Sequence, residues 1–230
     1  MLGIIGAMDV EVEQIKASLF DMNITKKAGM EFCKGTLEGK DVVIVRSGVG
    51  KVNAAICAQI LVDLFDVDAI INTGIAGSLK DEINIGDVVL STDAIQHDMD
   101  AVAFGYDIGV IPQMDNSVFK ADEKLIQIAE NACHKVCSDI NVFKGRIVSG
   151  DQFISSKEKK NWLTDNFQGY CTEMEGAAIA HAAYLNNIPF LIIRAISDKA
   201  DDSAHMDYPA FEKMAVENSV KMIHEFMKHW

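Results

Sequence analysis

Residues 190–198, FLIIRAISD, form an apolar run that ends in a hydroxyl and a carboxylate. Because apolar residues stand at consecutive positions, we expect both faces of this segment to be buried. That pattern is typical of a strand covered by helices on both sides, over Phe190–Ile196. Two further runs, AIIN within Ala69–Thr73 and VVIV within Val42–Arg46, share it. The three runs together predict an α/β protein.

Other β-branched runs alternate with helical patterns along the chain. The remaining predicted strands are Leu2–Ile5, Phe32–Leu37, Val88–Ile95 and Arg146–Ser149. The predicted helices are Asp9–Phe20, Lys51–Phe65, Ala121–Cys137, Glu175–Leu185 and a C-terminal helix that begins near Pro209, capped by Asp207. A hairpin turn predicted at Leu37–Asp41 makes the sheet mixed. We expect one domain over residues 1–230, a three-layer α/β/α sandwich around a central mixed, twisted β-sheet.

The composition excludes several classes of protein. The 230 residues carry 21 Lys and Arg against 34 Asp and Glu, a net charge of −13. This charge argues against nucleic-acid binding and against a basic membrane-surface protein. No segment has the length of an apolar membrane span, and the first residues lack the pattern of a signal peptide. Five cysteines fit reduced thiols, so we expect a cytoplasmic protein.

Glycines at the ends of the predicted strands favour a ligand pocket at that edge of the sheet. The segment SGVGKVN, residues 47–53, resembles two nucleotide-binding motifs and satisfies neither. A phosphate-binding loop needs Ser or Thr where Val52 stands, and a dinucleotide fingerprint needs a small residue where Asn53 stands. Cys133 and Cys137 are one helical turn apart but lack two further ligands of matching spacing. We therefore expect no cofactor and no metal.

Three segments carry unusual acids: Gly6–Glu11, Thr172–Ala178 and Arg194–Asp198. Acids at the start of a helix are common because they complement the helix dipole, and we adopt this interpretation for Asp9. Glu11 either complements the helix dipole in the same way or faces the predicted pocket. From position alone, Asp198 is equally well explained as a cap and as a catalytic acid.

Six motifs follow one another in a family order: GIIGAM-x-x-E, SGVGKVNAA, IINTGIAGS, VSGD-x-FI, EMEG and RAISD. They run from Gly3 to Asp198, and HDMDAVAFGY at residues 97–106 adds another match. The chain resembles the bacterial 5′-methylthioadenosine/S-adenosylhomocysteine nucleosidases, within the purine nucleoside phosphorylase-like superfamily. The resemblance implies hydrolysis of the bond between adenine and ribose in 5′-thio-substituted adenosines, as in methionine salvage.

The resemblance also implies roles for individual residues. Asp198, oriented by Ser197, would protonate the purine at N7, and Glu11 would activate the attacking water. Glu175 would accept hydrogen bonds from the ribose hydroxyls, while Arg194 and Glu173 hold the acids in place. Further substrate contacts are implied for Val49, Ile75, Ala76, Gly77, Phe153, Ile154, Met174 and Tyr208. Phe153 would stack on adenine, the Ile154 backbone would read its edge, and Met174 would pack under the ribose.

A homodimer is implied as well, because Ala101, Phe104 and Pro112 match residues that complete the neighbouring subunit's 5′-alkylthio site. Two positions depart from the family: Ile75 stands where relatives usually have Ser, and Ala101 where Val is frequent. Three alternatives remain: a nucleosidase for 6-amino-6-deoxyfutalosine, a phosphate-dependent purine nucleoside phosphorylase, and a nucleoside-binding protein without turnover. Acids at Asp9 and Glu11 would repel phosphate, which disfavours phosphorolysis.

Overall fold

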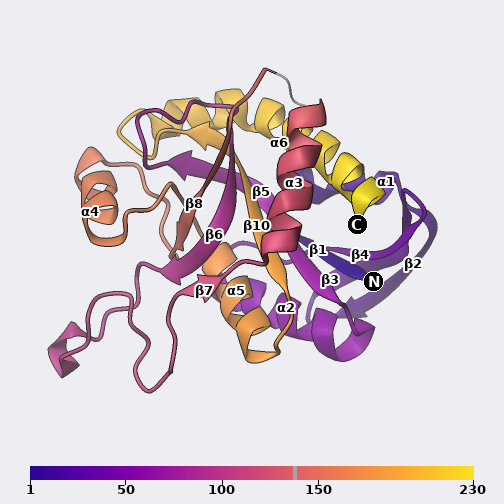
Figure 1. Ribbon diagram of the computed structural model, residues 1–230, viewed down its shortest axis with the longest axis horizontal. Helices are drawn as coiled ribbons and strands as arrows, with labels where there is room; N and C mark the ends of the chain where they lie inside the picture. The colour runs from indigo at the N-terminus through magenta and orange to yellow at the C-terminus, as the bar shows by residue number, and fades with distance from the viewer. Residues whose placement is uncertain (137–138) are drawn as a thin grey trace.

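The computed structural model describes residues 1–136 and 139–230, and these residues build a ten-stranded mixed sheet (Figure 1). The strands are β1 (Leu2–Gly6), β2 (Phe20–Lys27), β3 (Met30–Leu37), β4 (Lys40–Arg46), β5 (Ala69–Ser78), β6 (Val88–Gln96), β7 (Phe119–Lys120), β8 (Val142–Ser149), β9 (Cys171–Glu173) and β10 (Phe190–Asp198). Their order is β10-β6-β8-β9-β5-β1-β4-β3-β2, with β7 paired to β6.

Strands β4, β1, β5 and β10 form the parallel centre of the sheet. Every residue of β1, β5 and β10 is buried, which confirms the strand predicted from FLIIRAISD. Parallel strands end at the same edge of a sheet, so the segments that follow them meet there. That edge holds the site described below.

The sheet also closes on itself through a ring of five strands. β5 pairs with both β10 and β9, β10 pairs with β6, and β8 pairs with β6 and β9. The three-residue strand β9 is the link that completes this ring. Glu173, the last residue of β9, is thereby fixed beside the ends of β5 and β10.

Helices cover both faces of the sheet. α1 (Asp9–Ala17), α3 (Glu123–Val136) and α6 (Ala204–His229) pack together on one face, while α2 (Lys51–Phe65) and α5 (Gly176–Leu185) pack on the other (Figure 1). This arrangement confirms the predicted layered α/β fold. The described chain also has α4 (Lys157–Phe167) and the short 3-10 helix η1 (Val102–Phe104). In the described residues, no helix is both long enough and apolar enough to cross a membrane.

Several predicted boundaries were wrong. The helix predicted over Asp9–Phe20 ends at Ala17, because Phe20 pairs with Thr36 and begins the exposed edge strand β2. The C-terminal helix begins at Ala204 with Ser203 as its cap, so Pro209 lies inside the helix and Asp207 is not the cap. The predicted Ala121–Cys137 helix is seen as Glu123–Val136, and Cys137 lies outside the described residues.

Candidate active site

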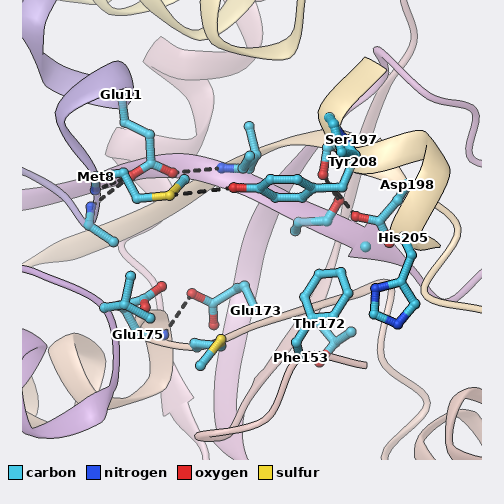
Figure 2. Close-up of a pocket in the computed structure, with 17 residues that line it drawn as sticks. Met8, Glu11, Phe153, Thr172, Glu173, Glu175, Ser197, Asp198, His205 and Tyr208 are labelled. Atoms are coloured by element: carbon cyan, nitrogen blue, oxygen red, sulfur yellow. Dashed lines mark hydrogen bonds between the residues drawn. The ribbon is translucent and has the colours of Figure 1, made fainter. Parts of the chain in front are cut away.

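A cavity of about 380 Å³ opens at the carboxyl ends of β1, β5 and β10 (Figure 2). It is lined by Ala7, Met8, Glu11, Val49, Ile75, Ala76, Gly77, Phe153, Thr172, Glu173, Met174, Glu175, Ser197, Asp198, His205, Tyr208 and Pro209. An adjoining recess adds Gln152 and Ile154. In Figure 2, Glu11 and Glu175 lie at one end of the cavity, and Asp198 and Phe153 lie at the other.

Glu11 both caps α1 and faces the cavity. Its Oε2 accepts hydrogen bonds from the backbone N–H groups of Ala7 (2.7 Å) and Met8 (2.9 Å), and its Oε1 from that of Ile75 (3.2 Å). Burial raises the pKa of this carboxyl, although Arg194 and the three N–H groups oppose the rise. A fixed carboxylate with a raised pKa is suited to accept a proton from water.

Arg194, behind the cavity wall, forms a buried ion pair with Glu173, which lines the cavity. Arg194 also donates to Asn72 Oδ1 (2.5 Å), and Glu173 accepts from Ser149 and from the Gly176 N–H (2.7 Å). Burial alone would raise the pKa of Glu173, but the Arg194 charge and these hydrogen bonds outweigh it and lower that pKa. Glu173 therefore stays ionised and adds a fixed negative charge next to Glu175.

Glu175 is the carboxyl at the N-terminus of α5. Its Oε1 accepts from the Gly50 N–H at 2.9 Å. Burial, reinforced by the charge of Glu173, raises the pKa of Glu175 to about 7, against the opposing effects of Arg194 and Gly50. At neutral pH this group is therefore poised between its two protonation states.

Asp198 ends β10 at the other end of the cavity. Its Oδ2 accepts from the Ser197 hydroxyl (2.9 Å), and its Oδ1 from the Ala200 N–H (2.8 Å). The Ala200 contact forms a local turn, so Asp198 is both a capping residue and a cavity residue. Burial raises the pKa of Asp198 despite these two bonds, and the nearby Asp207 and Asp201 raise it further. An acid of this kind holds its proton to a higher pH than an ordinary aspartate.

Aromatic and apolar side chains form the rest of the wall. Phe153 contacts the Tyr208 ring edge-on, with centroids 5.9 Å apart, and lies 5.5 Å from the His205 ring. Tyr208 donates its hydroxyl to Glu212 (3.0 Å), and that hydroxyl lies 3.4 Å from Met8 Sδ. The Tyr208 side chain thus reaches from the Phe153 ring to Met8, and Val49 adds a further apolar side chain to the lining.

The structure brings most of the sequence-predicted residues together, but not all. Arg194 lies behind the cavity wall, and Ile154 lies in the adjoining recess. Ala101, Phe104 and Pro112 lie outside this cavity, on and around η1. Ala101 is buried, whereas the Phe104 side chain is 85% exposed.

Sequence reasoning did not single out some of the cavity residues and supporting groups. These are Ala7, Met8, Thr172, His205, Pro209, Ser149, Asn72 and Gly50. Ala7, Met8, Ser149 and Gly50 stood inside the quoted motifs, so the motifs themselves carried a signal. His205 and Pro209 were missed because the C-terminal helix begins a full turn earlier than expected.

Arg46, the last residue of β4, is a basic residue near this edge of the sheet. Its guanidinium pairs with Asp9 across a 3.1 Å contact on the surface. No Lys or Arg lines the cavity among the described residues. In the same residues, no group of three His, Cys, Asp or Glu side chains is arranged to hold a metal ion.

Known proteins share the fold and much of the sequence. The family model described as the phosphorylase superfamily matches residues 1–228. The 5′-methylthioadenosine/S-adenosylhomocysteine nucleosidase of Staphylococcus haemolyticus is 40% identical over 229 residues, which cover 99% of each chain. The nucleosidase of Neisseria meningitidis, solved in complex with methylthio-immucillin-A, matches with a TM-score of 0.95 and 38% identity, covering 100% of this chain and 99% of that one.

A futalosine hydrolase of Helicobacter pylori has the same fold. It matches with a TM-score of 0.94 and 30% identity, and the match covers 100% of this chain and 97% of that one. The nucleosidases of Staphylococcus haemolyticus and Neisseria meningitidis are more similar to this chain than that hydrolase, at 40% and 38% identity over nearly its full length. The chain belongs to the phosphorylase superfamily and, within it, to the 5′-methylthioadenosine/S-adenosylhomocysteine nucleosidases.

Proposed function

We propose that this enzyme hydrolyses the N-glycosidic bond of 5′-methylthioadenosine and S-adenosylhomocysteine, releasing adenine and the 5′-thio-substituted ribose. The observation that carries this proposal is the distribution of acids in one cavity. Asp198, with a raised pKa, lies beside the Phe153 ring, and Glu11 and Glu175 lie at the opposite end. An acid beside a planar ring fits a purine, and two carboxylates fit a sugar that becomes cationic.

The chemistry begins at the base. Asp198 transfers its proton to purine N7, and the electron pair of the glycosidic bond then moves onto the protonated base, which leaves as neutral adenine. The ribosyl group that remains has oxocarbenium character, as in sugar hydrolysis. The negative charges of the cavity stabilise this cation, because they are fixed in place and shielded from water. Water attacks C1′, and Glu11 takes its proton.

The rest of the cavity supports binding. Glu175 accepts hydrogen bonds from the 2′- and 3′-hydroxyls, and Met174 packs under the ribose. Met8, Val49 and Tyr208 offer an apolar slot for the 5′-alkylthio group. Arg194 and Glu173 hold the neighbouring carboxylates in place from behind. Ser197 and the Ala200 N–H orient Asp198.

We further propose a cytoplasmic homodimer in which Ala101, Phe104 and Pro112 complete the 5′ slot of the neighbouring subunit. The 85% exposure of the Phe104 side chain supports this, since a large aromatic side chain is costly to leave in water. Val49 lines the cavity and is itself 49% exposed, so an added aromatic wall would help to enclose a thioether. No cofactor is required for these steps.

Phosphorolysis is disfavoured by charge. A phosphate dianion needs cationic partners, whereas Glu11 and Glu173 face the cavity and Arg46 is paired with Asp9. The futalosine hydrolase match favours one second candidate, a nucleosidase for 6-amino-6-deoxyfutalosine. That reaction would use the same acids and differ only in the 5′ slot.

Product analysis tests the proposal directly. Incubation with 5′-methylthioadenosine or S-adenosylhomocysteine, with and without phosphate, should release adenine and the free thio-substituted ribose at the same rate in both conditions. Chromatography measures the products, and 6-amino-6-deoxyfutalosine serves as a third substrate. Strict dependence on phosphate, or a sugar 1-phosphate as product, would reject hydrolysis.

Asp198→Asn serves as the matched variant in the same assay. The amide keeps the shape of the side chain but has no acidic proton to give, so turnover should fall by about 10²–10⁴-fold. Far-ultraviolet circular dichroism and the melting temperature should show that the fold is retained. Residual activity within tenfold of the wild type would reject Asp198 as the general acid.

A further inference from the structure

Lys51 and Asp98 have no part in the mechanism above, and they belong to two sequence motifs, SGVGKVN at residues 47–53 and HDMDA at residues 97–101. The structure joins them through one ion pair. The Lys51 ammonium donates to Asp98 Oδ1 at 2.6 Å and to Gln96 Oε1 at 3.1 Å. The Lys51 and Asp98 side chains are only 18% and 16% exposed, so water and salt screen this pair less than a surface pair.

A third segment joins the same cluster. The other oxygen of Asp98 accepts from the Asp151 N–H at 2.9 Å, and Asp151 Oδ1 accepts from the Lys51 N–H at 2.8 Å. The carboxylates of Asp98 and Asp151 thus tie together the loops that follow β4, β6 and β8. The loop after β8 continues to Phe153, and the loop after β6 continues to Phe104.

The loop after β4 supplies a hydrogen bond to the Glu175 carboxylate. Gly50, which directly precedes Lys51, donates its N–H to Glu175 Oε1 at 2.9 Å. Gly50 has a φ of 96°, which side-chain-bearing residues rarely adopt. A Cβ at Gly50 would lie 3.1 Å from Asp151 Oδ1, so the backbone passes close to the cluster. The direction of the Gly50 N–H therefore depends on where Lys51 is held.

We propose that the Lys51–Asp98 ion pair is a positioning device that holds the Gly50 N–H against Glu175 and so orients this carboxylate toward the ribose hydroxyls. The inference rests on the proposed function, which supplies the hydroxyl contact. With Oε1 held by Gly50, the other oxygen of Glu175 has a defined direction. Without the ion pair, the loop loses an anchor, and the carboxylate loses its orientation. Lys51 and Asp98 do not touch the reacting atoms.

The test compares two substrates, 5′-methylthioadenosine and its 2′-deoxy analogue, in the full-length enzyme. Lys51→Met and Asp98→Asn should each lower kcat/KM for the ribose substrate by about tenfold, mainly through KM, because one charge-assisted contact is weakened. The kcat/KM for the 2′-deoxy substrate should fall much less. The ratio of kcat/KM between the ribose and the 2′-deoxy substrate therefore becomes smaller in these variants. The double variant should be no worse than either single variant, since the same pair is broken.

Lys26→Met is the matched control, because it breaks another lysine–carboxylate pair, with Glu31 at 2.7 Å, on the distant β2–β3 hairpin. It should leave both substrates unchanged. Asp98→Asn keeps the side-chain shape, so this variant tests the inference if Lys51→Met fails to fold. Equal losses for the two substrates, or kcat/KM within twofold of wild type, would overturn the inference. A wild-type enzyme that releases no adenine would instead reject the proposed function.

Discussion

Carboxyl groups within one cavity are given different proton affinities by their immediate partners. Glu173 has a lowered pKa because Arg194 and several hydrogen-bond donors outweigh its burial. Glu175 has one backbone donor and a charged neighbour, and its pKa rises to about 7. Asp198 lies farther from Arg194, and burial raises its pKa. Such separation lets one site hold a permanent anion and a proton donor at the same pH.

The raised pKa of Glu175 predicts a pH-dependent stability. Between its ordinary value of 4.5 and about 7, the native state retains a proton that the unfolded state releases. The stability that this group contributes is therefore present below pH 4.5 and is lost as the pH rises through about 7. Glu175→Gln has no such loss. Its melting temperature minus that of the wild type should increase by roughly 6–12 °C between pH 4.5 and pH 8.

Differential scanning calorimetry across this pH range measures the difference. The Gln side chain can still accept the Gly50 hydrogen bond, so only the titration is removed. Glu13→Gln, on the exposed side of α1, controls for removing a carboxyl elsewhere. If the Glu175→Gln and wild-type curves run parallel, the carboxyl titrates normally and its proposed environment is wrong.

At the scale of elements, the Arg194–Glu173 pair fastens β10 to β9. Glu173→Gln would remove the carboxylate that directly contacts the Arg194 guanidinium, which is only 2% exposed. Removing one partner of a buried pair typically costs about 3–5 kcal/mol, and we expect a loss of that order in the free energy of unfolding. Urea denaturation followed by fluorescence measures it. Glu31→Gln, which breaks an exposed pair, should not move the midpoint, and an equally small effect of Glu173→Gln would contradict the role of the pair.

The long apolar elements were predictable, and the short or charged ones were not. FLIIRAI and AIIN predict strands because they can be buried on both faces, and both lie where expected. β9 has three residues, too few for periodicity to show. α4 reads KEKKNWLTDNF, in which charges hide the buried Leu163 and Phe167. β2 is exposed along its whole length, so its partner β3, and not its own pattern, makes it a strand.

The site residues that lie within the sequence motifs were predictable. Glu11, Glu175 and Asp198 stand in motifs at strand ends, where the topology brings them together. Some of the donors that orient them come from distant segments and could not be derived from spacing: Gly50 donates to Glu175, and Ile75 to Glu11. Likewise, Asn72 Oδ1 accepts a hydrogen bond from Arg194 only because β5 and β10 are neighbours. Three-dimensional pairing supplies that information.

At the scale of the whole molecule, the proposed dimer makes Phe104 a residue of another subunit's site. Phe104→Ala should raise KM for 5′-methylthioadenosine by about tenfold, because the slot loses one aromatic wall. Co-expression with Asp198→Asn should restore a wild-type KM in a fraction of the sites. In a mixed dimer, the subunit that carries Phe104→Ala has an intact Asp198 and receives Phe104 from its partner.

Steady-state kinetics of the co-expressed and separately purified variants provide the comparison, and sedimentation velocity gives the oligomeric state. Mixing Phe104→Ala with wild type is the control, which should also yield sites of normal KM. Failure of the co-expressed pair to regain a normal KM would show that Phe104 acts within its own chain or not at all.

The closed ring of β5, β10, β6, β8 and β9 has a consequence for how the protein acquires activity. Closing it requires segments from residues 69 to 198 to pair across long stretches of chain, and each closure costs entropy before any contact repays it. Glu173 and Asp198 reach their positions only when β9 and β10 have joined. A chain emerging during synthesis therefore stays catalytically silent until almost all of it is available, and the cavity is the last part of the molecule to become useful.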